Sequence, residues 1–200
     1  MHISLEENLP YNVLAIVVLA IFHGIYFGKM LAQKRKGIRT HQIGTRKERQ
    51  LHTVEVLMGI ATFVIVPVQL CAIVFGWSHM PSGARFTGFL TAMLGDAIFF
   101  ISVLTMRDSW RAGIPAKDRT ALVTDGIYAY SCNPAFLGFD CMYIGVFLLY
   151  ANWLTGICTV FAIVMLHLQI LEEEKFMTAT QGATYLTYKN KVFRYLGRKR

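Results

Sequence analysis

Long apolar blocks separated by short polar segments dominate the sequence. Five blocks, residues 11–32, 54–77, 86–106, 134–150 and 153–171, approach the roughly 20 residues that a helix needs to cross about 30 Å of hydrocarbon. Only Ala151 and Asn152 separate the last two blocks, so a tight antiparallel helical hairpin is expected there. The pattern predicts an all-α, polytopic bundle of five transmembrane helices, forming a single integral membrane domain over residues 1–200.

Composition favours a membrane protein over a soluble or disordered one. Hydrophobic residues make up 54% of the 200 residues and charged residues only 16%, whereas soluble domains contain about 25% charged residues. The chain also has too much apolar surface to stay disordered. Its four cysteines form no CxxC pair, so we expect neither a disulfide framework nor a metal site.

The basic residues give the five-span layout an orientation. A net charge of +8 could indicate nucleic acid, but nineteen of the twenty Lys and Arg residues fall on segments that share one side of the layout, with Arg85 as the exception. Such asymmetry marks the cytoplasmic side of a membrane protein. We therefore expect the N-terminus outside, the C-terminus in the cytoplasm, membrane lipids as partners and no nucleic acid partner.

One segment on the predicted cytoplasmic side, residues 120–138, has features beyond those of an ordinary loop. Asp125 followed by Gly126 favours a turn. Asn133 followed by Pro134 is typical of a helix start, with Asn as the N-cap and Pro in the first turn. The N–H groups at such a start suit a carboxylate or phosphate. The same residues could simply begin the fourth span, so both interpretations stay open.

Three adjacent acids follow the fifth apolar block: Glu172, Glu173 and Glu174. They lie near a helix C-terminus and near hydrocarbon, where anions are disfavoured, so a cation is needed close by. Lys175 and the basic tail could supply it, or a cationic ligand could. Residues four apart share a helix face, which places Gln169 beside Glu173, and His167 aligns with Glu174 two turns on. At most two of the three acids can enter one pocket.

The C-terminal region contains an amphipathic pattern over residues 182–195. Its apolar positions are Tyr185, Leu186, Tyr188, Val192 and Phe193. This spacing predicts a helix that either lies at the membrane interface or packs over a cytoplasmic pocket.

Several single residues in or beside the spans carry separate expectations. Asp96 and Asp140 are intramembrane acids, which are either functional or protonated and hydrogen-bonded between helices. His23 and His79 are interpreted as structural residues that lie away from the expected pocket. The glycines expected to permit close helix packing are Gly24, Gly28, Gly59 and Gly145.

The order and spacing of these motifs resemble the isoprenylcysteine carboxyl methyltransferase family, which is similar to the phospholipid methyltransferases. The resemblance covers about residues 120–196 and rests on Gly126-x-Tyr128, Asn133-Pro134-x-Phe136-x-Gly138, a helical hairpin, Glu173-Glu174 and Gly182-x-x-Tyr185-x-x-Tyr188-x-x-x-Val192. It implies an integral membrane methyltransferase that uses S-adenosylmethionine at the cytoplasmic face. The implied acceptor is lipophilic, either the carboxylate or the amine of a lipid or prenylated molecule.

The resemblance also implies a set of site residues. The cofactor-binding positions are Thr120, Ala121, Leu122, Val123, Tyr128, Asn133, Pro134, Ala135, Phe136 and Glu173. Gln169 stands where the isoprenylcysteine enzymes carry an arginine that faces the substrate. A helix N-terminus suits the carboxylate of S-adenosylmethionine, and a glutamate suits its ammonium group. An amine acceptor needs a base, for which Glu174 and His167 are the candidates.

Two substitutions separate this chain from the family pattern. Cys132 stands where an arginine is usual, and Asn133 stands where a histidine is usual. Asn retains hydrogen-bonding groups, but Cys cannot replace the donors of a guanidinium. Gln169 likewise weakens the case for a prenylcysteine carboxylate as acceptor. Two other functions stay open: a membrane NADPH-dependent reductase-like protein, because sterol reductases share a similar C-terminal region, and a non-catalytic lipid-binding relative.

Overall fold

Six α-helices and two short 3-10 segments form the part of the chain that the computed structural model describes, residues 5–44, 48–114 and 121–199. The helices are α1 (Leu5–Arg35), α2 (Arg49–Val74), α3 (Ser82–Met106), α4 (Pro134–Leu149), α5 (Trp153–Gln181) and α6 (Ala183–Lys191). The 3-10 segments are η1 (Arg107–Ser109) and η2 (Gly126–Ala129). Over these ranges the β structure amounts to two isolated bridges. The predicted all-α class is confirmed.

Four of the helices, α1, α2, α3 and α5, are long and apolar enough to cross a membrane. The fourth apolar block forms α4, whose 16 residues span about 24 Å and fall short of a typical hydrocarbon core of about 30 Å. The count of five spans therefore stays a prediction. α5 continues past residue 171 to Gln181, so the three adjacent acids lie on a helix and not in a loop.

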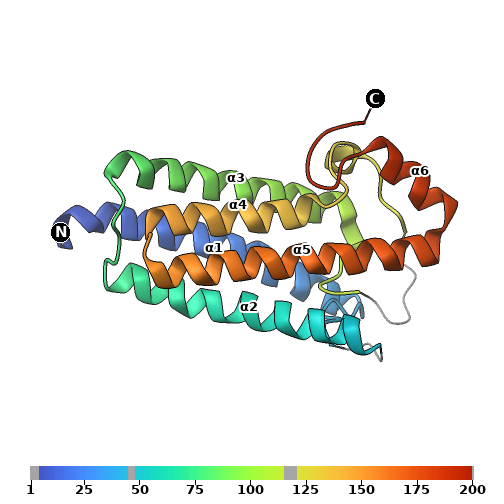
Figure 1. The fold of residues 1–200 in the computed structure, drawn as a ribbon, viewed down its shortest axis with the longest axis horizontal. Helices are drawn as coiled ribbons and strands as arrows, with labels where there is room; N and C mark the ends of the chain where they lie inside the picture. Colours follow the sequence, from blue (N-terminus) through green and yellow to red (C-terminus); the bar gives the residue numbers. More distant parts are fainter. Residues whose placement is uncertain (1–4, 45–47, 115–120, 200) are drawn as a thin grey trace.

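The helices lie side by side along the long axis of the molecule, and its two ends differ in character (Figure 1). The end of α1, the starts of α2 and α4, η2 and α6 gather at one end, which is on the right in Figure 1. The N-terminus and the α2–α3 and α4–α5 connections lie at the other end. Because α6 and the start of α4 share one end, the two motif-bearing segments of the sequence meet there.

The contact between α3 and α4 is close enough to bring the two backbones together. A Cβ atom at Gly88 would lie 2.7 Å from the carbonyl oxygen of Gly145, and one at Gly95 would lie 2.7 Å from the carbonyl oxygen of Gly138. A Cβ at Gly145 would overlap the main-chain nitrogen of Ala92. Small residues allow this approach between helices in a membrane, where packing rather than the hydrophobic effect drives association.

Only some of the glycines expected to permit close packing do so. The expectation is confirmed for Gly145 but is wrong for Gly24 and Gly28, because no other helix of the described structure comes within 4 Å of a Cβ placed at either residue. At Gly59 the Cβ would make an ordinary contact of 3.5 Å with Ile43. Hydrophobic periodicity identifies the helices but does not tell which helix faces which, so the partners of Gly145 could not be found from the sequence.

Arg85, the one basic residue assigned to the opposite side, lies inside the bundle. Its side chain is 1% exposed, and its Nε donates to the carbonyl oxygen of Leu149 at 3.0 Å. The guanidinium carbon lies 4.0 Å from the ring centre of Tyr11 and 4.9 Å from that of Tyr150. Contacts of this kind contribute about 2 kcal/mol when they are shielded from water. Arg85 therefore joins α1, α3 and the end of α4, and is not a loop charge.

Gly95→Ala is expected to destabilise the protein, because the added methyl group would lie 2.6 Å from the main-chain nitrogen of Met142 and force α3 away from α4. Overpacking of this kind costs about 1–3 kcal/mol. Gly24→Ala is the matched control, since its Cβ position is open. Thermal unfolding in detergent should show a lower Tm for Gly95→Ala than for Gly24→Ala. Equal Tm values would contradict the close contact.

Candidate functional site

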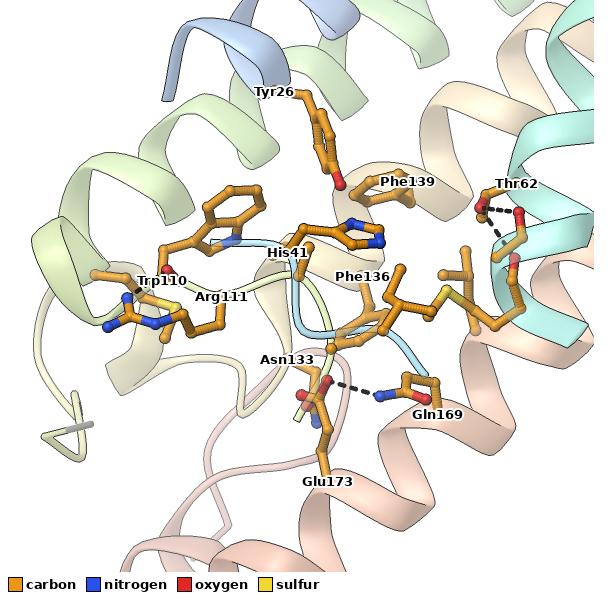
Figure 2. Close-up of a pocket in the computed structure, with 18 of the residues that line it drawn as sticks. Tyr26, His41, Thr62, Trp110, Arg111, Asn133, Phe136, Phe139, Gln169 and Glu173 are labelled. Carbon is orange, nitrogen blue, oxygen red and sulfur yellow. Dashed lines mark hydrogen bonds between the residues drawn. The ribbon is translucent and has the colours of Figure 1, made fainter. Parts of the chain in front are cut away.

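A cavity of about 880 Å³ lies between the helices, within the range of ligand pockets in proteins, about 300–1,000 Å³. Figure 2 shows Asn133, Gln169 and Glu173 at one end of this cavity and the aromatic residues Tyr26 and Phe139 at the other. The polar end is lined from η2, the start of α4, α5 and α6, and the apolar end mainly from α1 and α2. The cavity is thus divided into a polar and an apolar half.

Most of the residues that the sequence assigned to the site meet at this one cavity. Those that line it are Leu122, Val123, Tyr128, Asn133, Ala135, Phe136, Gln169, Glu173 and Glu174. Ala121 is exposed, Pro134 is buried, and neither of them lines the cavity; His167 does not line it either. Thr120 lies outside the described residues. The structure brings these side chains together, and their roles remain proposals.

The first turn of α4 faces the cavity. α4 begins at Pro134 with Asn133 at its N-cap position, as predicted, but the Asn133 side chain makes no capping hydrogen bond. Its Nδ2 instead donates to the carbonyl oxygen of Arg194 at 3.2 Å. The first N–H groups of a helix have no intrahelical acceptor. Since Ala135 and Phe136 line the cavity, these N–H groups lie at its polar end.

Two of the three adjacent acids are neutralised by basic residues of the chain. Glu172 pairs with Lys175 at 2.6 Å. Glu174 accepts from the Nζ of Lys189 at 2.7 Å and from the Nε of Arg194 at 2.6 Å, with a further bond from Arg194 Nη2 at 3.0 Å. This neighbour also raises the pKa of the Arg194 guanidinium. Lys175 and the basic tail therefore supply the cations that Glu172 and Glu174 require.

Glu173 is the acid that this arrangement leaves for a ligand. Within the described ranges no Lys or Arg pairs with it, and its carboxylate accepts from the Nε2 of Gln169 at 3.2 Å (Figure 2). Gln169 is fully buried, and its Oε1 makes no hydrogen bond to any described residue. An unsatisfied buried acceptor costs about 1–3 kcal/mol. The pair therefore offers acceptors to a donor or a cation.

The C-terminal segment packs over the polar end of the cavity. Of the two placements expected for its amphipathic pattern, at the membrane interface or over a pocket, the structure shows the second. Buried Tyr185, Tyr188 and Val192 contact Leu122, Cys132 and Met177. The hydroxyl of Tyr188 donates to the carbonyl oxygens of Tyr128 at 2.7 Å and Ser131 at 3.1 Å. The N–H of Cys132 donates to the carbonyl oxygen of Phe193 at 3.0 Å. Cys132 thus helps to dock the tail.

Burial sets the protonation of two side chains at the polar end. It raises the pKa of the Tyr128 phenol, with a smaller contribution from the negative charge of Glu173. It also raises the pKa of the Cys132 thiol. Both groups are therefore neutral at physiological pH. Tyr128 retains a hydroxyl that can donate a hydrogen bond, and the Cys132 thiol, in place of the usual arginine, donates to the carbonyl oxygen of Val192 at 3.6 Å.

The two predicted base candidates are engaged with the C-terminal segment. Both carboxylate oxygens of Glu174 accept from Lys189 or Arg194. The Nδ1 of His167 lies 2.6 Å from the hydroxyl oxygen of Tyr195. These contacts favour a structural role for both residues, so the geometry does not support either one as the base.

Sequence reasoning missed two histidines of the cavity. His23 lines it, so the expectation that His23 lies away from the pocket is wrong; His79 does lie away from it, with its Nδ1 3.1 Å from the carbonyl oxygen of Ala151. His41 also lines the cavity (Figure 2). It lies in the connection after α1, where the sequence has no helical periodicity from which the direction of the His41 side chain could be predicted. Asp96 and Asp140, the acids predicted to lie within the spans, do not line the cavity.

Comparisons with known proteins fit this geometry. The family described as phospholipid methyltransferase matches residues 84–183, which cover the α3–α4 contact and the acids of α5. The chain is 30% identical over 122 residues to the protein-S-isoprenylcysteine O-methyltransferase of Saccharomyces cerevisiae. That match covers 60% of this chain and 51% of the yeast protein, so the chain spans about half the length of the curated relative it matches.

Glu174→Gln is expected to loosen the C-terminal segment, because it removes the charge that Lys189 and Arg194 share. The amide of Cys132 donates a hydrogen bond to this segment, and the amide of Gly197 donates one from this segment to the rest of the chain. Hydrogen exchange should accelerate at both amides. We expect about a tenfold acceleration, equivalent to about 1.4 kcal/mol.

Glu172→Gln is the matched control for this measurement, since Glu172 pairs with Lys175 on its own helix and does not line the cavity. It should leave both amides unchanged. The same exchange rates in Glu174→Gln and Glu172→Gln would show that the tail does not depend on Glu174.

Proposed function

Because the chain belongs to the phospholipid methyltransferase family, we propose that it transfers a methyl group from S-adenosylmethionine to a lipophilic acceptor in the membrane. The observation that carries this proposal is the placement of Glu173. It is the one acid of three without a cationic partner among the described residues, and it lies on the cavity wall together with the first turn of α4. Such a site suits a ligand that carries both an ammonium and a carboxylate group.

The residues of the polar half fit the parts of S-adenosylmethionine. Glu173 would hold the ammonium group, since a carboxylate forms strong charge-assisted hydrogen bonds. The first N–H groups of α4, beside Ala135, would hold the carboxylate. The aromatic faces of Tyr128 and Phe136, with Leu122 and Val123, would flank the adenine and the sulfonium. When bound, the sulfonium supplies an electrophilic methyl group.

The apolar half of the cavity supports a lipophilic acceptor. Phe22, Tyr26 and Phe139 line this half, and Phe63 of α2 lines it while remaining 77% exposed on the outer surface of the bundle. Methyl transfer is a direct displacement at carbon, so the protein contributes chiefly by aligning the two reactants and excluding water. A cavity with a polar half and an apolar half holds the two ligands next to each other.

The proposed orientation places the polar half of the cavity on the cytoplasmic side. The end of the bundle that bears α6 and the start of α4 also carries the basic residues, which the positive-inside rule assigns to the cytoplasm. In this arrangement α4 is a fifth crossing, and the methyl donor enters from the cytoplasm while the acceptor enters from the bilayer.

Glu173→Gln is expected to weaken binding of S-adenosylmethionine by about 10–100-fold, because a hydrogen bond to a charged group contributes about 1.5–3 kcal/mol. Calorimetric titration of the purified protein measures this directly. Glu172→Gln, which changes the neighbouring acid outside the cavity, should bind with wild-type affinity. Unchanged affinity in Glu173→Gln, or binding of NADPH in place of S-adenosylmethionine, would contradict the proposal.

A further inference from the structure

The main chain around His41 is held firmly against the segment that follows η1. The N–H of Ala112 donates to the carbonyl oxygen of Thr40 at 3.0 Å, and the N–H of Gln42 donates to that of Ala112 at 2.8 Å. The carboxylate of Glu55, which is fully buried, ties the same two segments together. It accepts from the N–H of Gly44 at 2.8 Å and from the N–H of Ile114 at 3.0 Å. The His41 side chain therefore projects from a fixed point.

The imidazole of His41 projects into the cavity. Figure 2 shows the ring reaching toward Phe139, above Phe136 and the hydrogen-bonded pair of Gln169 and Glu173. No hydrogen bond or ion pair to this ring occurs within residues 5–44, 48–114 and 121–199. Both ring nitrogens can therefore meet a ligand. The ring lies at the junction of the polar and apolar halves, where the acceptor head group must meet the methyl group.

The charges around this junction favour a cationic head group. Glu173 lines the cavity and Glu55 lies just behind the loop that bears His41, whereas Glu174 is already paired with Lys189 and Arg194. Arg111 and His23 are the other basic side chains on the wall, and the remaining titratable groups are tyrosines and Cys132. A carboxylate or thiolate acceptor would meet these acids unfavourably, whereas an ammonium group can donate to the vacant Oε1 of Gln169.

We propose that His41 is a catalytic residue that removes a proton from an amine head group of the acceptor. This inference rests on the proposed methyl transfer and specifies its acceptor. The amine gives one proton to the imidazole, and its lone pair then forms a bond to the methyl carbon. The bond between this carbon and sulfur breaks, and its electron pair stays on sulfur. The products are a methylated ammonium, a neutral thioether and a protonated His41, which releases its proton to water.

The test uses the full-length protein in vesicles with labelled S-adenosylmethionine and either hexadecylamine or hexadecanoate as acceptor. We expect methylation of the amine and none of the carboxylate. His41→Gln should retain wild-type binding of S-adenosylmethionine in calorimetry but lose about 10²–10⁴-fold in transfer, the usual contribution of general base catalysis. The rise of kcat/KM with pH that reports the wild-type base should be absent in this variant, and imidazole added in solution should restore transfer in His41→Ala.

His52→Gln is the matched control, since His52 is exposed near the same end and does not line the cavity. It should keep the wild-type rate and pH profile. If His41→Gln transfers methyl groups at the wild-type rate and still binds the cofactor, the catalytic role of His41 is overturned, but the amine acceptor is not. Methylation of hexadecanoate but not of hexadecylamine would overturn the amine acceptor. Failure of the wild-type protein to bind S-adenosylmethionine would overturn the proposed function, and this inference with it.

Discussion

The backbone contact between α3 and α4 determines where the site can form. Gly138 lies one turn from the start of α4, and its Cβ position is 2.9 Å from the carbonyl oxygen of Gly95. The first turn of α4 is therefore held in place by one of the closest contacts in the bundle. Phe136 and Phe139 project from the same part of α4 into the cavity. A short helix that packs this tightly can present its N-terminus to a ligand without a capping side chain.

Charge explains the polar half of the cavity. Basic residues dominate this end of the bundle, yet α5 carries three adjacent acids there. Glu172 and Glu174 find cations within the chain, and Glu174 uses them to bring the C-terminal segment over the polar end. Glu173 is left with a neutral partner, Gln169. The same sequence feature thus both covers the site and leaves inside it one acid with no cationic partner among the described residues.

Much of the fold and part of the site could be predicted from local sequence patterns. The apolar blocks predict four long helices and the shorter α4, the Asn133–Pro134 pair predicts the start of α4, and the four-residue spacing predicts the contact of Gln169 with Glu173. The pairing of glycines between α3 and α4 and the placement of His41 could not be predicted, because periodicity does not specify which elements meet. The continuation of α5 beyond its acids to Gln181 was not predicted, since charge marks the end of an apolar block but not the end of a helix.

The central claim is that the polar half of the cavity binds the methyl donor between the first turn of α4 and Glu173. A crystal structure of the protein in a lipid phase with S-adenosylhomocysteine tests it most directly. We predict density for the amino acid moiety of that ligand between the N–H groups of Ala135 and Phe136 and the carboxylate of Glu173. Density for the ligand elsewhere, with Glu173 still bound only to Gln169, would contradict the claim.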